Sequence, residues 1–540
     1  MDSGLIVRDL KTELGTILVE GNVNRAKTPY TSLRLKIYRD SVLICTLRQN
    51  LVYKGTSAPF CFSYSIPAGL HEYTISLYGK KKSVITLDTS INGIVAGDVF
   101  IIEGQSNAFA TMRDKESANA NKSEFIRVFG NPDPNPGVTN AHSKWFVGQG
   151  DGDFKENGHA GQWGLRLGRL LVDSIKMPVA IFNGAFGGTP ISYYERAKNY
   201  KTELASNYAR LYHRLTLTGL QNHVRAIIWS QGESDVLQGT KISTYMNELD
   251  TLLKNWKQDY PAVEKIYIFQ TAGQCYLNYG SLLPIAEAQR EVALKHDSVI
   301  EIIPTSALKP DKGGLHFDYK GGYEIFGDRI FSLISRDLYG VKSSHEIDAP
   351  MITSAFLNDS TTIIVTENAR SIIPRYANSP IQNYGLRNSN GAVIDSVFPL
   401  KNNIIFLLSK YPGKKVTISY YADSVDGANR LTNSSGIEIL TFCNFPVTDS
   451  IGTTMFVTPF IIPRMKVYPK IIHTVATVKL NLYGKYTIEL DDLAGRTLKQ
   501  DKFTGIQYDL DIPGLTKGIY FVRIFDKDKN LVGTSKMVVQ

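Results

Sequence analysis

Apolar and polar residues alternate within short segments of the first 94 residues. Leu33, Leu35 and Ile37 fall on one side of an alternating run at positions 32–38, and Gly and Pro residues separate this run from its neighbours. A period of two is typical of strands with one buried face, and turn residues between such runs favour antiparallel pairing. The pattern predicts a small β-sandwich domain over residues 1–94.

From about residue 95, short apolar runs alternate with segments whose apolar residues have helical spacing. Trp163 and Leu167 lie one turn apart ahead of the apolar run 179–182, and residues 249–256 show the same spacing ahead of the run 266–269. Strands that alternate with helices are typical of a parallel sheet covered on both faces. We therefore predict an α/β domain over residues 95–342.

After about residue 345 the helical spacing disappears. Strand-like runs at positions 361–365 and 415–421 stand between clusters of Asn, Asp, Ser and Gly. They predict an immunoglobulin-like or fibronectin-like β domain over residues 345–460. A last β pattern, with a Gly turn between strands, covers residues 463–540. This division agrees with a length of 540 residues, which is too long for one hydrophobic core.

The net charge of +9 is modest for this length. It would favour acidic over neutral glycans, but a solvated basic surface without a target is the commoner explanation. No cluster of basic and aromatic residues argues for nucleic acid, and no apolar run approaches the roughly 20 residues that cross a bilayer. We expect neither a nucleic acid partner nor a membrane span. The first residues lack the features of a signal peptide, so the protein is either cytoplasmic or begins after a removed signal.

Ser106 is the first candidate for chemistry. It stands in Gly104-Gln105-Ser106-Asn107, directly after the apolar run 99–102. Open α/β sheets carry their chemistry at the carboxyl ends of strands, and small residues around a turn let a Ser side chain stand clear of the backbone. A Ser in this place is more often a helix N-cap, so the assignment needs partners.

Three further strand ends supply such partners. They are the Gly-rich segment 183–190, the segment 229–235 with sequence Trp-Ser-Gln-Gly-Glu-Ser-Asp, and the segment 314–317 with sequence Gly-Leu-His-Phe. Together with Ser106 they provide a nucleophile, hydrogen-bond donors for an oxyanion, and a His base. This is the inventory that acyl transfer requires.

These four segments, in this order, resemble the carbohydrate O-acetylesterase branch of the SGNH hydrolases, which includes sialate O-acetylesterases and related acetylxylan esterases. The resemblance spans roughly residues 95–340 and implies a flavodoxin-like parallel sheet. It implies Ser106 as nucleophile and His316 as general base. It also implies an oxyanion hole formed by the amides of Ser106 and Gly187 and by the side chain of Gln231.

The acid partner of His316 departs from the family pattern. Family members commonly carry an Asp two or three residues before the His, but Gly314 and Gly313 occupy those positions, and the nearest acid is Asp311. We predict that the loop brings Asp311 within hydrogen-bond reach of the imidazole. Glu233 or a backbone carbonyl could orient His316 instead, or the site could be a Ser-His dyad. Glu233 could equally be a buried structural acid held by turn amides.

The last segment resembles the type A C-terminal sorting domain of the type IX secretion system of Bacteroidetes. The similarity rests on Tyr468-Pro469, the turn 492–496 and the strand-like segment 515–523, although Lys470-Ile471 replaces the usual Asn-Pro. It implies that the type IX machinery handles the protein and that the protein is secreted or held at the cell surface. A trimmed signal peptide would then explain the first residues.

We therefore predict a secreted serine esterase that removes O-acetyl groups from sialic acid or another acetylated glycan, without a metal or other cofactor. A competing hypothesis is a surface glycan-binding protein with an inactive hydrolase scaffold, which the shifted Asp and the many β domains would suit. A lipase or thioesterase of the same superfamily is a third interpretation. The Gln-Gly-Glu segment favours the carbohydrate-acting branch.

Overall fold

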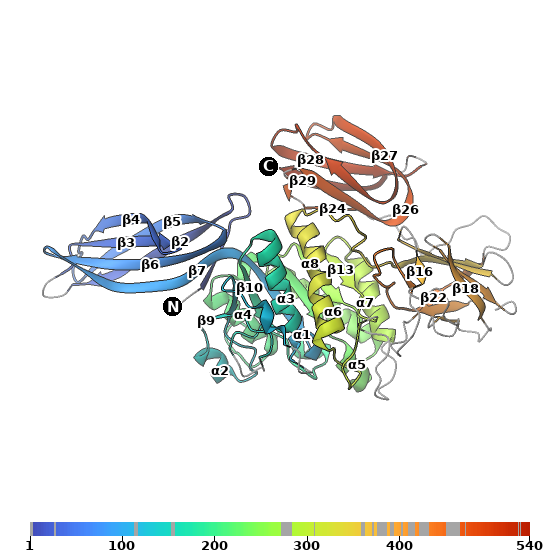
Figure 1. The fold of residues 1–540 in the computed structure, drawn as a ribbon, viewed down its shortest axis with the longest axis horizontal. Coiled ribbons are helices and arrows are strands. Elements are labelled where there is room, and N and C mark those ends of the chain that lie inside the picture. Colours follow the sequence, from blue (N-terminus) through green and yellow to red (C-terminus); the bar gives the residue numbers. More distant parts are fainter. Residues whose placement is uncertain are drawn as a thin grey trace. The chain divides into compact units, whose positions relative to one another are not determined.

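We describe the protein from a computed structural model (Figure 1). The described residues are 4–25, 29–112, 117–152, 157–271, 283–306, 308–357, 362–369, 372–374, 386–388, 394–400, 403–408, 416–420, 431–449, 465–469, 471–472, 474–527, 529 and 531–540. The chain forms two compact units. The first contains Met1–Gly187, Tyr193–Ile227 and Lys254–Val263, and the second contains Gly188–Ser192, Ile228–Leu253 and Glu264–Gln540.

The first unit begins with antiparallel β-structure. Its strands are β1 (Gly4–Val7), β2 (Leu14–Asn24), β3 (Ser32–Arg39), β4 (Val42–Asn50), β5 (Ser57–Pro67), β6 (Gly69–Lys81) and β7 (Val84–Gly104). One sheet pairs β4 with β3, β3 with β6 and β6 with β7, while β2 pairs with β5. Leu33, Leu35 and Ile37 are buried in one shared core, as their alternation predicts.

Strand β7 continues from this β-structure into the α/β part of the same unit (Figure 1). Its first half pairs with β6, and its second half pairs in parallel with β10 (Val179–Asn183). Strands β8 (Ile126–Phe129) and β9 (Trp145–Val147) extend the sheet beyond β10. The residues of β7 from Ile94 to Gly104 are buried, because helices cover this half of the strand on both faces.

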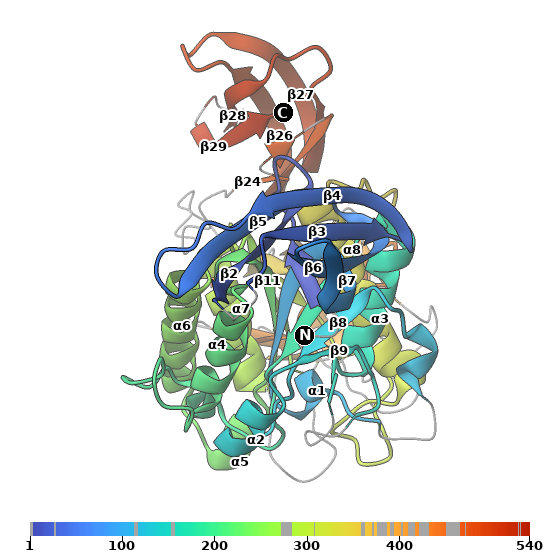
Figure 2. The same cartoon turned by 90° about the vertical axis from the view of Figure 1, so that its left-hand side faces the viewer.

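Helices α3 (Gln162–Leu170) and α4 (Asn207–Leu217) lie on opposite faces of this sheet, as Figure 2 shows. Successive side chains of a strand point to opposite faces. A Cβ atom at Gly164 of α3 would lie 2.7 Å from Ile102 Cδ1. Glu103 is the next residue of β7. A Cβ atom at Gly184 would meet both the Glu103 carboxylate and the side chain of Leu211, which belongs to α4. Ile102 therefore faces α3, and Glu103 faces α4.

The remaining helical segments of this part are short. They are α1 (Ser106–Phe109), η1 (Ala118–Asn121), α2 (Pro136–Ala141), η2 (Leu171–Ile175), η3 (Ile191–Tyr194) and η4 (Gln221–His223). Strand β11 (Val224–Ser230) and helix α6 (Ile242–Asp259) each contribute residues to both units.

The second unit contains the rest of the alternating strands and helices. These are α5 (Glu233–Gln238), β12 (Lys265–Phe269), α7 (Leu283–Lys295), β13 (Ile300–Ile303), η5 (Tyr319–Tyr323) and α8 (Glu324–Tyr339). Strands β12 and β13 pair in parallel. The predicted strands at 179–182 and 266–269 and the predicted helix at 249–256 are confirmed as β10, β12 and part of α6. Among the described residues, no helix has the length and apolar character needed to cross a bilayer.

Between residues 352 and 449 of the second unit, the described residues form strands and no helix. They are β14 (Ile352–Leu357), β15 (Thr362–Glu367), β16 (Ile373–Pro374), β17 (Leu386–Asn388), β18 (Ile394–Leu400), β19 (Asn403–Leu408), β20 (Thr417–Tyr420), β21 (Leu431–Thr432), β22 (Phe442–Pro446) and β23 (Thr448–Asp449). One sheet has the order β18-β19-β15-β14-β23 and another the order β17-β20-β22. Their inward residues form a core of their own, as expected for a separate β region.

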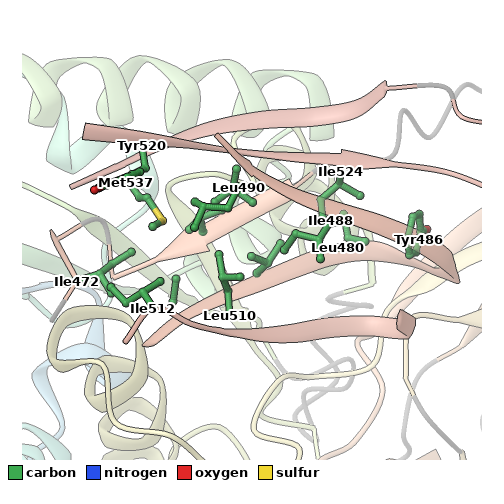
Figure 3. Packing of buried hydrophobic residues seen from close by; sticks show 14 of the residues in the cluster. Ile472, Leu480, Tyr486, Ile488, Leu490, Leu510, Ile512, Tyr520, Ile524 and Met537 are labelled. Atoms are coloured by element: carbon green, nitrogen blue, oxygen red, sulfur yellow. The ribbon is translucent and has the colours of Figure 1, made fainter. Parts of the chain in front are cut away.

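The last segment is a six-stranded β region. Its strands are β24 (Met465–Tyr468), β25 (Ile471–Ile472), β26 (Val475–Asp491), β27 (Thr497–Asp511), β28 (Gly518–Phe525) and β29 (Leu531–Val539). Figure 3 shows their buried side chains, among them Ile488, Leu490 and Ile524, gathered between the strands. The predicted Gly turn joins β26 to β27, where Gly495 has φ +80° and Asp492 accepts hydrogen bonds from the amides of residues 494 and 496.

Candidate active site

Ser106 is the first residue of helix α1, directly after strand β7. The strand ends at Gly104, whose φ of +131° favours glycine. The Gly104 carbonyl oxygen accepts a hydrogen bond from the Phe186 amide at 2.9 Å, and the Tyr194 hydroxyl lies 2.5 Å from the same oxygen. Ser106 is 7% exposed. The turn thus holds the Ser at the carboxyl end of a buried strand, where the sequence predicts it.

Helix α1 has only four residues, so its stability depends on groups that satisfy its backbone carbonyls. Each of the last carbonyl oxygens has a donor: Trp163 Nε1 at 2.8 Å from Asn107 O, Asn183 Nδ2 at 3.3 Å from Ala108 O, His159 Nε2 at 2.7 Å from Phe109 O, and the Gln162 amide at 2.9 Å from Ala110 O. These donors come from β10 and from α3 and the loop before it. Sequence analysis did not identify them, because their role depends on contacts between distant segments.

Gly187 lies beside Ser106 in the first unit. A Cβ atom at Gly187 would stand 3.6 Å from the Ser106 Cβ. The turn that carries Gly187 follows β10, and the Asn183 side chain holds it by accepting a hydrogen bond from the Ala185 amide at 3.0 Å. Gly187 and Gly188 are both exposed. The structure therefore brings the predicted nucleophile, which is largely buried, next to one predicted oxyanion donor, which is exposed.

Glu103 is a buried acid that sequence analysis missed. It precedes Gly104 in β7 and is 2% exposed. Burial raises the pKa of its carboxyl group to about 8, even though the Arg214 and Arg210 guanidinium groups act in the opposite direction. Gly184 adjoins this carboxyl group so closely that a Cβ atom there would overlap it. In the sequence, the one feature that points to a buried acid here is the Glu at the end of an apolar run.

In the second unit, Gln231 occupies the turn between β11 and α5. Its backbone carbonyl oxygen accepts hydrogen bonds from Gln289 Nε2 at 2.7 Å and from the Tyr245 hydroxyl at 3.2 Å. The next residue, Gly232, has φ +144°, and a Cβ atom there would lie 2.7 Å from side-chain atoms of Ile285. The Gly is therefore required both by its backbone conformation and by the space around it.

The side-chain amide of Gln231 is fully buried, and both of its hydrogens are used. Nε2 donates to the Thr189 carbonyl oxygen at 3.2 Å and to Asp235 Oδ2 at 2.5 Å. Asp235 Oδ2 also accepts a hydrogen bond from the Ile191 amide at 2.9 Å. Donation from Gln231 to an oxyanion would require one of its two bonds to break. Asp235 is the last residue of the Trp-x-Gln-Gly-Glu-x-Asp motif, which is the signal that could have identified it.

His316 and Asp311 face each other across a tight loop. Pro310 and Phe317 form an antiparallel bridge, and the Asp311 amide donates to the His316 carbonyl oxygen at 2.7 Å. The loop therefore turns within residues 312–315, and two Gly residues lie at its tip. His316 Nδ1 lies 3.7 Å from Asp311 Oδ2, with the two side chains 17% and 15% exposed. The distance is that of an ion pair and is longer than the hydrogen bond expected from the sequence.

Aromatic packing fixes the base of this loop. The Phe317 ring lies 5.9 Å from the Tyr323 ring and 5.1 Å from the Phe326 ring, measured between centroids. Glu233 lies in the first turn of α5, where the amino-terminal end of the helix favours a negative charge. Its side chain is largely buried. Its predicted role as an alternative partner of His316 stays a prediction.

Comparison with known families identifies this region. Residues 96–334 match the family model described as carbohydrate esterase, sialic acid-specific acetylesterase. These residues therefore form a domain of that esterase family. The match includes every predicted site residue, from Ser106 to His316. No curated protein matches the chain in sequence.

Solved structures share the fold at low sequence identity. A carbohydrate acetylesterase from Xanthomonas citri is 15% identical, with a TM-score of 0.55, and the match covers 82% of this chain and 97% of that one. A protein from Arabidopsis thaliana is 21% identical, with a TM-score of 0.35 and coverage of 44% and 98%. The shared fold rests on the first of these. It agrees with an SGNH-like α/β domain that carries a mixed sheet, helices and further β regions.

A second family model covers the carboxyl-terminal segment. Residues 466–540 match the secretion system C-terminal sorting domain, which confirms that the chain carries a sorting tail after its esterase-family domain. Among the described residues, no three His, Cys, Asp or Glu side chains are grouped so that they could hold a metal ion.

Proposed function

We propose that this protein is a serine esterase that removes O-acetyl groups from carbohydrates. The observation that carries the proposal is the placement of Ser106 on a braced helical turn beside the Gly187 backbone, within residues that belong to the esterase family. His316, with Asp311 as its facing acid, supplies the base. The pairing of Ser106 with His316 is part of this proposal.

The reaction follows from these roles. As the Ser106 hydroxyl oxygen attacks the acetyl carbonyl carbon, His316 takes the hydroxyl proton. The tetrahedral intermediate collapses, the bond to the sugar oxygen breaks, and His316 returns the proton to that oxygen. Water then attacks the acetyl-Ser106 ester with His316 as base, the bond from the acetyl carbon to the Ser106 oxygen breaks, and His316 returns the proton to that oxygen as acetate leaves. The products are acetate and a free sugar hydroxyl.

Negative charge develops on the acetyl carbonyl oxygen during both steps. We assign the amides of Ser106 and Gly187 as donors to it, with the Gln231 side chain as the third predicted donor. Asp311 stabilises the imidazolium form of His316 from the opposite side of the ring. Glu233 is the alternative acid, and no cofactor takes part in the proposed reaction.

We propose an O-acetylated sialic acid as the first substrate to test. The description of the matching family names sialic acid, and the net charge of +9 suits an acidic glycan. Xylan acetate is the neutral alternative. The experiment compares acetate release from acetylated sialic acid, acetylated xylan and a long-chain acyl ester, with Ser106→Ala as the inactive control. Glycan binding without acetate release would favour an inactive scaffold, and preference for the long chain would favour a lipase.

We further propose four domains over residues 1–94, 95–342, 345–460 and 463–540. The second would be a flavodoxin-like α/β domain, and the first and third would be β-sandwiches. Separate hydrophobic cores within residues 17–96, 352–447 and 467–539 support the division. Limited proteolysis followed by mass mapping of the stable fragments tests the proposed boundaries.

The sorting tail supports a proposal about location. We infer that the type IX secretion machinery of a Bacteroidetes cell exports the protein and that it acts as a secreted or cell-surface enzyme. An acetylated glycan outside the cell would then be its substrate and main partner. To test this location, native host cells are fractionated and the protein is detected in each fraction with an antibody. Accumulation in the cytoplasm would contradict the proposal.

A further inference from the structure

The loop that carries Gly187 is held at both of its ends but not at its tip. We call residues 186–191 the Gly187 loop. At its start, the Phe186 amide is bonded to the Gly104 carbonyl oxygen at 2.9 Å. At its tip, Gly188 has φ +73°, and a Cβ atom there would meet no atom within 4 Å. Packing therefore does not fix the tip, and its position depends on its two ends.

The far end of the loop is held by two buried side chains. Gln231 Nε2 donates to the Thr189 carbonyl oxygen at 3.2 Å, and Asp235 Oδ2 accepts from the Ile191 amide at 2.9 Å. Asp235 is 1% exposed. These bonds hold the backbone carbonyl before Pro190 and the backbone amide after it. The loop is thus fixed within two residues of Gly187.

Asp235 also fixes the orientation of the Gln231 amide. Its carboxylate oxygen lies 2.5 Å from Gln231 Nε2. If the amide were reversed, Gln231 Oε1 would face this carboxylate oxygen, and two acceptors would oppose each other. Asp235 therefore keeps the amide nitrogen towards itself, and the second hydrogen of that nitrogen reaches Thr189. The bonds form one relay from Asp235 through Gln231 to the loop.

We propose that Asp235 is a positioning residue of the esterase site and that it acts through Gln231 and the Gly187 loop to place the Gly187 amide. This inference rests on the proposed function, because it concerns the oxyanion donor of that reaction. An oxyanion donor acts only when it is correctly placed, and a misplacement of about 1 Å can lower turnover by about a hundredfold. The expected effect of losing the relay is therefore on kcat rather than on KM.

Two variants test the relay: D235A, which removes the acceptor at this position, and D235N, which keeps it. In D235A, the Gln231 side-chain amide and the Ile191 amide both lose the oxygen that accepts their hydrogen bonds. In D235N, the side-chain carbonyl oxygen can still accept both bonds, as Asp235 Oδ2 does in the wild type. D235N therefore removes the charge and keeps the relay.

We expect D235A to lower kcat at least about tenfold, with KM within about threefold, and D235N to keep kcat within about threefold of the wild type. Rescue by the conservative variant is the result that a positioning role through hydrogen bonds predicts. Wild-type kcat in D235A, or a loss in D235N as large as the loss in D235A, would overturn the proposal.

Hydrogen exchange separates this inference from the proposed function. We expect the peptide that contains Ile191 to exchange faster in D235A than in the wild type, and Glu195→Gln, which changes an exposed acid of the same segment, to leave exchange and kcat unchanged. Absence of acetate release by the wild type would contradict the proposed function and leave the exchange result valid. Unchanged exchange in D235A would show that Asp235 does not hold the Ile191 amide, and it would overturn the proposal at any level of activity.

Discussion

The Asp311 carboxylate lies 3.7 Å from Nδ1 of His316, although five positions separate the two residues in the chain. The backbone explains this proximity. The Pro310–Phe317 bridge and the bond from the Asp311 amide to the His316 carbonyl oxygen make the two residues opposite neighbours, as in a hairpin. The backbone pairing therefore brings an acid five residues before the His to within ion-pair distance of its imidazole ring.

The first prediction concerns this acid. Asp311→Asn should lower kcat at least about tenfold, because the neutral amide no longer stabilises the imidazolium that forms when His316 takes the Ser106 proton. The loss should be smaller than the loss in Ser106→Ala. Acetate release under steady-state conditions measures both variants.

Asp318→Asn is the matched control. Asp318 follows His316 by two residues, but its carboxylate pairs with Lys309 at 2.8 Å. We expect its kcat within about twofold of the wild type. If Asp311→Asn behaves like this control while Glu233→Gln loses activity, Glu233 is the acid partner.

The second prediction concerns the nucleophile. Ser106→Ala should abolish hydrolysis of a small acetyl ester and leave the melting curve unchanged, since side chains of distant segments donate hydrogen bonds to the backbone carbonyls of α1. Active-site labelling with a fluorophosphonate and mass spectrometry of the modified peptide checks the assignment independently. Wild-type turnover in the folded variant would exclude Ser106 as nucleophile.

Local patterns in the sequence account for the elements more fully than for the site. The strands that end near Ser106 and Gln231 follow from apolar runs, and the buried alternation of Leu33 and Leu35 follows from a period of two. The brace around α1 could not be predicted in this way, because Trp163 resembles an ordinary core residue until its Nε1 is seen at the Asn107 carbonyl oxygen. The loop geometry at Asp311 depends on two backbone pairings that a sequence does not display.

The third prediction concerns the sorting tail. Deletion of residues from 463 onward should leave kcat within about twofold of the full chain, because the tail has a hydrophobic core of its own. Thermal stability should fall moderately, since Lys466 Nζ pairs with Glu301 Oε1 at 3.2 Å, and Glu301 keeps Lys265 as a partner at 3.5 Å. Acetate release and thermal melts of both proteins measure these effects.

The same deletion tests export. In a native host with type IX secretion, the shortened protein should collect in the periplasm, while the full chain should reach the surface or the medium. A tail with a purely structural role would instead give an insoluble or inactive shortened protein. Lys466→Ala is the control that removes the ion pair and keeps the tail.

The last prediction concerns Glu103, whose folded-state pKa of about 8 lies above the ordinary Glu value of 4.5. An acid with a raised pKa binds its proton more tightly in the folded state. Its contribution to stability is therefore fully present below about pH 4.5 and is lost as the pH rises towards 8. The loss amounts to roughly 4 kcal/mol over that range, at about 1.4 kcal/mol for each pH unit.

Glu103→Gln should remove this loss, because the amide has no charge to bury. Relative to the wild type, the variant should gain stability steadily between pH 5 and 8, whatever constant offset the new amide introduces. Melting temperatures of both proteins at half-unit pH steps measure the difference, with the exposed Glu195→Gln as control. A difference that does not change with pH would show that Glu103 is already ionised in the folded protein, with Arg214 and Arg210 compensating its charge.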